Sequence, residues 1–112
     1  MSDELAERLR SAVAAIEGTE RVEATFRIGG PVGAQSVVNI HTPATEQTSI
    51  TAILEQAMAR CAEVLTDAPT DKGNLFLYCY DAEGMRHTMS EVAEDLSVAI
   101  SFTRLMLRVR GV

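Results

Sequence analysis

The stretch that most constrains the fold is Thr45–Leu65, which reads TEQTSITAILEQAMARCAEVL. Its apolar residues recur at steps of three and four, so they share one face of an α-helix. They are Ile50, Ile53, Leu54, Ala57, Met58, Cys61, Val64 and Leu65. A helix with one wide apolar face is stable in a globular protein only when that face is buried. We therefore expect a central helix on which a β-sheet packs.

Two alternating segments precede this helix. Glu20–Ile28 switches to a period of two, which is typical of a strand with one buried face and one wet face. Its apolar positions are Val22, Ala24, Phe26 and Ile28, and its polar positions are Arg21, Glu23, Thr25 and Arg27. Ala34–Thr42 resumes the alternation after a short link rich in glycine, 29–33. The two segments are therefore predicted to form an antiparallel hairpin.

A third strand is predicted after the helix, at Asn74–Tyr80. This segment is apolar or aromatic on both faces, which is typical of a central strand. One face carries Leu75, Leu77 and Cys79, and the other carries Phe76, Tyr78 and Tyr80. Asp81–Gly84 has the composition of a tight turn, so Met85–Met89 is expected to pair back as a short strand.

The two ends of the chain are predicted to be helical. Ser2–Glu17 has an apolar face at helical spacing, and Thr103–Arg110 continues such a spacing from Phe102. A long strand over 98–109 is the alternative at the C-terminal end, with a short strand at Val98–Ile100 before the favoured helix.

The resulting order of elements is α-β-β-α-β-β-α. It predicts one α+β domain over residues 1–112, with two layers: an antiparallel sheet of about four strands packed against helices. Many small folds share this layout, so it does not indicate a function by itself.

The charge of the chain limits its partners. The net charge of −6 over 112 residues argues against nonspecific nucleic-acid binding, which needs basic surface. No apolar run approaches the roughly 18 residues of a membrane span, and the charged start lacks the apolar region of a secretory signal. We therefore expect a small acidic cytoplasmic domain that contacts neither membrane nor nucleic acid, unless the chain was cut from an exported protein.

Residues 97–112 contain three arginines and no acid. They either complement the dipole of a C-terminal helix or form a small basic patch for an acidic partner or for the acidic body of the chain itself.

Few residues are suited to chemistry. Cys61 and Cys79 are the only thiols, and both lie on apolar faces, so we expect buried free cysteines. His41 and His87 are the only histidines, and no local spacing makes either a metal ligand. We predict no catalytic residue, no metal site and no cofactor. If the fold encloses a pocket between sheet and helices, its weak candidates are His41, Tyr78, Tyr80 and His87.

The leading hypothesis is a non-enzymatic interaction or assembly module that binds a protein partner or a second copy of itself as a homodimer. The sheet edge and the apolar C-terminal segment would form the contact, with Phe102, Leu105, Met106 and Val109 as interface residues. A small-ligand-binding or enzymatic domain is the alternative. A third hypothesis is an adaptor that binds a basic partner through its acidic body.

Overall fold

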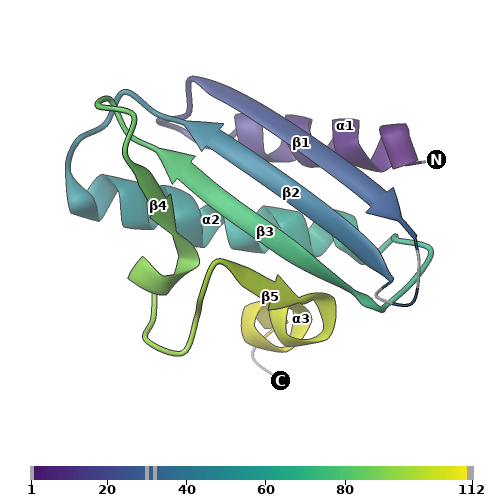
Figure 1. Ribbon diagram of the computed structural model, residues 1–112. Helices are drawn as coiled ribbons and strands as arrows, with labels where there is room; N and C mark the ends of the chain where they lie inside the picture. The colour runs from purple at the N-terminus through teal and green to yellow at the C-terminus, as the bar shows by residue number, and fades with distance from the viewer. Residues whose placement is uncertain (1, 30, 32, 111–112) are drawn as a thin grey trace.

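The computed structural model describes residues 2–29, 31 and 33–110 (Figure 1). The elements follow the predicted order. They are α1 (Ser2–Ala14), β1 (Arg21–Ile28), β2 (Ala34–His41), α2 (Gln47–Leu65), β3 (Gly73–Tyr80), β4 (Arg86–Thr88), the 3₁₀ turn η1 (Met89–Glu91), β5 (Ala99–Ser101) and α3 (Phe102–Arg110). The α+β layout predicted from the sequence is confirmed.

The strands form one five-stranded sheet in the order β1-β2-β3-β4, with β5 also paired to β3. β1–β2, β3–β4 and β3–β5 are antiparallel, but β2 and β3 are parallel. The sheet is therefore mixed, and the prediction of an antiparallel sheet is wrong at this pair. The reason is α2, which returns the chain to the starting end of β2, so that β3 runs in the same direction.

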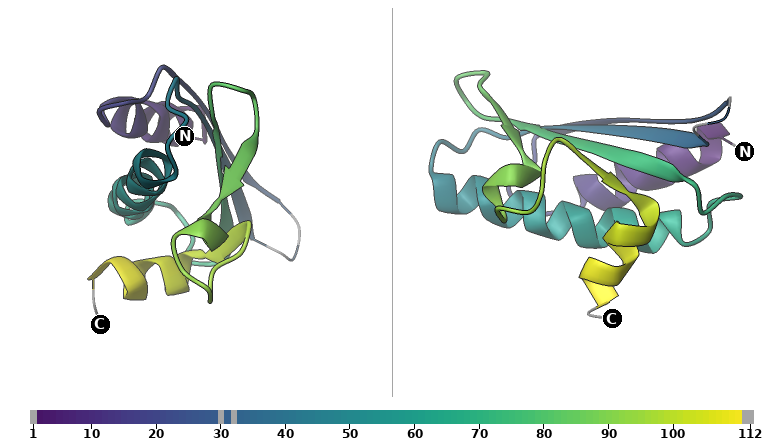
Figure 2. Two further views of the ribbon diagram at one scale, coloured as in Figure 1. Left: turned by 90° about the vertical axis from the view of Figure 1, so that its left-hand side faces the viewer. Right: turned by 60° about the horizontal axis from the view of Figure 1, so that its bottom comes forward.

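The three helices lie on one side of this sheet (Figure 2). α1 packs on β1, and α2 crosses behind the middle of the sheet. Every apolar residue of the central helix named above is buried, which confirms its predicted packing. The opposing side chains come from alternate strand residues such as Val38, Leu75, Leu77 and Cys79. The core is therefore the layer between the sheet and α1 and α2.

The C-terminal segment is a short strand followed by a helix, as favoured from the sequence. α3 buries Phe102 and Leu105. The Phe102 ring lies nearly parallel to that of Phe26, with 6.4 Å between centroids. It also lies so close to Gly73 that a Cβ atom there would come within 2.5 Å of the ring. The start of α3 is thereby fixed against β1 and β3. Among the described helices, none is long and apolar enough to cross a membrane.

Candidate functional site

The face of the sheet that points away from the helices is left open by the described elements (Figure 2). Alternate residues of the strands point to it, and the register aligns them in four rows across the sheet. The rows are Arg21, His41, Tyr80 and Arg86; Glu23, Asn39, Tyr78 and Thr88; Thr25, Val37, Phe76 and Ala99; and Arg27, Gln35, Asn74 and Ser101. We call this set the outer face.

Aromatic side chains run along the centre of the outer face. Phe76, Tyr78 and Tyr80 follow one another on β3, and all three are half-buried. The Tyr80 ring stacks on His41, with 5.2 Å between centroids and 16° between planes. The Arg86 guanidinium lies 5.0 Å from the centroid of Tyr78. Tyrosine, phenylalanine and arginine are enriched in protein interfaces, so this composition is typical of a binding surface.

Arginines occupy three of the four corners of the outer face: Arg21, Arg27 and Arg86. The only acid in the set is Glu23, whose carboxylate lies 3.1 Å from Nε2 of His41 and 4.0 Å from Nε of Arg21. Within the described chain, Arg27 and Arg86 form no ion pair. The outer face therefore carries a net charge of +2 in a chain whose net charge is −6.

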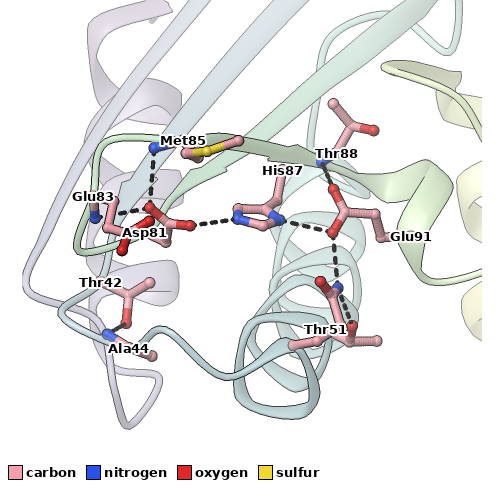
Figure 3. A network of polar contacts seen from close by, with 10 residues as sticks. Thr42, Ala44, Thr51, Asp81, Glu83, Met85, His87, Thr88 and Glu91 are labelled. Carbon is pink, nitrogen blue, oxygen red and sulfur yellow. Dashed lines mark hydrogen bonds and ion pairs between the residues drawn. The ribbon is translucent and has the colours of Figure 1, made fainter.

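A second polar feature surrounds His87, on the other side of the β3–β4 pair (Figure 3). Its Nε2 lies 2.8 Å from Oδ2 of Asp81, and its Nδ1 lies 2.7 Å from Oε1 of Glu91. Gln47 at the start of α2 donates to the same Glu91 oxygen at 2.7 Å. The second Asp81 oxygen accepts two backbone N–H groups of the β3–β4 turn. The cluster therefore ties that turn, η1 and α2 together.

Both ring nitrogens of His87 face carboxylate oxygens, an arrangement that favours the cation with both nitrogens protonated. The hydrogen bond to Asp81 is the main cause that raises the pKa of His87, and the same bond lowers the pKa of Asp81. Partial burial alone would raise the pKa of Glu91, but hydrogen bonds from His87 and Gln47 lower it. In the cationic form, with both nitrogens donating to carboxylates, the imidazole has no lone pair for a metal or a substrate proton.

An apolar groove lies between the end of α2, the loop after it and α3. Its volume is about 440 Å³. At this groove Arg110 donates a hydrogen bond of 2.9 Å to Oγ1 of Thr66. The lining residues are Leu65, Thr66, Ala68, Thr70, Asp71, Phe102, Thr103, Met106, Leu107 and Arg110. The groove offers apolar walls with one cation, Arg110, and one carboxylate, Asp71.

The structure separates the four pocket candidates. His41, Tyr78 and Tyr80 come together on the outer face, whereas His87 lies on the helix side of the sheet. The weak candidates therefore do not converge between sheet and helices. Two of the arginines that give the outer face its positive charge, Arg27 and Arg86, were not identified as candidate binding residues from the sequence. The alternation in β1 placed Arg27 on the wet face, but nothing in the sequence predicted its spacing from Arg86.

The other predicted residues are distributed as follows. Phe102 and Leu105 belong to the core, Met106 lines the groove and Val109 is 39% exposed. Cys61 and Cys79 are buried free cysteines, as predicted. Burial raises the pKa of the Cys61 thiol to about 12 and that of the Cys79 thiol to about 11. Within the described ranges, no group of three or more His, Cys, Asp or Glu side chains is placed to hold a metal ion.

Comparison with protein-family models, with curated proteins and with solved structures finds no match for this chain.

Proposed function

We propose that this protein is a non-enzymatic interaction module that binds a protein partner on its outer face. The observation that supports the proposal is the open sheet face with an aromatic centre and two arginines that lack an acidic partner in the described chain. The half-buried rings offer apolar area to a partner. Little side-chain entropy is lost when the partner binds, because neighbours such as His41 already hold the rings in place. Arg27 and Arg86, at diagonally opposite corners, provide charge.

The chemistry of the outer face favours a short acidic segment of a partner protein. A face of +2 on a chain of −6 is a local basic patch surrounded by acidic surface. A long polyanion such as nucleic acid would extend over that acidic surface and be repelled. A short segment with acids on either side of an apolar residue fits within the patch and contacts both the rings and the arginines.

An NMR titration tests this proposal. The isotope-labelled chain is titrated with a synthetic peptide in which aspartates and glutamates flank one phenylalanine. We expect chemical-shift changes confined to the outer face, and an affinity that falls as salt is added. Arg86→Glu should weaken binding about tenfold, which corresponds to ~1.4 kcal/mol.

Arg60→Glu is the matched control, because Arg60 is exposed on α2 and makes no ion pair within the described chain. Equal weakening by Arg60→Glu would show that only net charge matters and would contradict a defined site on the outer face. If a short single-stranded oligonucleotide shifts the outer-face resonances more strongly than the peptide does, the partner is a nucleic acid instead.

The apolar groove beside α3 supports a second candidate function, the binding of a small amphipathic ligand. Its volume of about 440 Å³ lies within the range of small-molecule sites, roughly 300–1,000 Å³. Arg110 could pair with a carboxylate while Met106 and Leu107 contact an apolar tail. Decanoate should then raise the melting temperature of the wild type but not of Met106→Glu, and butyrate should have little effect. No shift with decanoate would remove this candidate.

A further inference from the structure

One edge of the sheet is formed by β1, at the side opposite β4 (Figure 1). The hairpin to β2 is closed by the Gly29 N–H, which donates to the Gly33 carbonyl at 3.3 Å in the same register as the strand pairs. In an antiparallel pair the bonded positions alternate, so the odd-numbered residues of β1 direct their backbone groups toward β2. The even-numbered residues direct theirs outward, at the open edge. They are Val22, Ala24, Phe26 and Ile28.

These outward backbone groups have no hydrogen-bond partner within the described residues. Proteins usually protect such an edge by making it short, or by a proline, a bulge or charged side chains. β1 is eight residues long, contains no proline and keeps an unbroken register with β2, so the charges of Arg21, Glu23 and Arg27 are its only protection of these kinds. α1 packs on its inner face and not along its edge. Ile28, at the end of the strand, is 53% exposed.

We propose that β1 pairs antiparallel with β1 of a second copy of this chain, about a two-fold axis at Thr25. In this register Glu23 of each copy lies opposite Arg27 of the other. Val22 lies opposite Ile28, so the exposed isoleucine gains an apolar neighbour. Each of the four even-numbered residues donates and accepts one backbone hydrogen bond across the axis. The charged pairs fall at the non-hydrogen-bonded positions, where side chains approach most closely.

Neighbouring registers fit less well. A shift of two residues in one direction sets Arg21 opposite Arg27, and a shift of four sets Glu23 opposite Glu23. Like charges directly opposite one another destabilise a strand pair. A shift of two residues in the other direction leaves Glu23 and Arg27 with no charged residue opposite them. A shift by an odd number would place the buried face of one copy beside the wet face of the other.

The two-fold axis is perpendicular to the sheet, so the sheets of the two copies join into one continuous sheet. The two outer faces then lie side by side on the same surface, and the helices of both copies lie on the other. This pairing goes beyond the function proposed for the outer face, because it uses the edge of β1 and none of the aromatic residues. The two proposals share Arg27, which pairs with Glu23 of the other copy in the dimer, so Arg86 is then the cation left for an acidic segment.

Molar mass in solution, measured by light scattering after size exclusion over a range of concentrations, tests the pairing. The wild type should form a dimer of twice the 12.1 kDa chain mass. Glu23→Lys and Arg27→Glu each place two pairs of like charges across the axis, so each should raise the dissociation constant on the order of tenfold. The double variant restores both opposite-charge pairs and the net charge, and should recover the dimer.

Mixing the two single variants is the sharpest form of the test. The lysine introduced by Glu23→Lys in one chain then faces the glutamate introduced by Arg27→Glu in the other. The unchanged Arg27 of the first chain faces the unchanged Glu23 of the second, so a heterodimer should form although each variant alone dissociates. Arg86→Glu is the control, since it alters the outer face and should leave the dimer intact. Both substituted side chains are exposed, and circular dichroism verifies that the variants fold.

A wild type that stays monomeric at the highest concentration would overturn the proposal. A dimer that the single variants leave unchanged would overturn it as well, because another surface would then hold the copies together. Amide hydrogen exchange provides an independent readout. The N–H groups of Ala24 and Phe26 should be protected in the wild-type dimer and exchange rapidly in the single variants. Failure of peptide binding at the outer face would leave each of these outcomes unaffected.

Discussion

Leu105→Ala tests how α3 is attached to the rest of the molecule. Only two residues of this nine-residue helix are buried, Phe102 and Leu105, and Leu105 is completely so. Replacing a fully buried leucine with alanine costs ~2–5 kcal/mol, because buried apolar area is lost and a cavity remains. The free energy of unfolding of a folded protein is ~0.05–0.15 kcal/mol per residue, so that of a chain of 112 residues is about 6–17 kcal/mol. The variant should therefore fold but be strongly destabilised.

Leu107→Ala is the matched control, since it makes the same chemical change two residues further along the same helix. Leu107 is 47% exposed, so its loss should change the free energy of unfolding by at most about 0.5 kcal/mol. Urea unfolding followed by circular dichroism measures both. With a slope of roughly 1–3 kcal/mol per molar urea, Leu105→Ala should lower the midpoint by about 0.7–5 M, and Leu107→Ala by about 0.5 M at most.

Equal destabilisation by the two substitutions would refute this packing of α3. It would mean that Leu107 is buried in solution. If the cost of Leu107→Ala also grew with protein concentration, a second copy would be covering α3, as the sequence-based hypothesis of an interface over 98–109 requires.

Two further predictions concern buried or partly buried ionisable groups. Because the pKa of His87 is raised on folding from 6.5, its contribution to stability is complete below about pH 6.5 and is lost as the pH rises through the raised value. The urea midpoint should therefore fall more between about pH 6 and about pH 9 in the wild type than in His87→Gln, and equal slopes would contradict the charged cluster. Cys61 and Cys79 should resist a thiol reagent in the native state and both react in urea, whereas rapid labelling of the native chain would show that either site opens readily.

Much of the fold could be predicted because its hydrophobic patterns are local. The central helix and the strand Glu20–Ile28 both carry a clear period, and both appear close to their predicted bounds. The direction of β3 relative to β2 could not be read in this way. It depends on the path of α2 across the sheet, which is set by how that helix packs and not by any alternation within a strand.

The exposure of the β3 face that carries Phe76, Tyr78 and Tyr80 also could not be predicted from a local pattern. Apolar residues on both sides of a strand predict a central position, and β3 is central. The pattern does not tell whether a second layer covers the aromatic face. Here the described helices all lie on the other side, so neighbouring side chains such as His41 and Arg86 cover the rings only in part.

Net charge is a poor guide to binding on a surface of this kind. The value of −6 describes the whole chain, and it argues against a long polyanion spread over the molecule. Yet the period of two in β1 sends both of its arginines to one face, and the pairing of Tyr80 with Arg86 adds a third from a strand nearly sixty residues later. The acids of the chain lie mostly elsewhere. A binding experiment on the intact protein therefore needs a short ligand, because a long one would report the average charge and conceal the local patch.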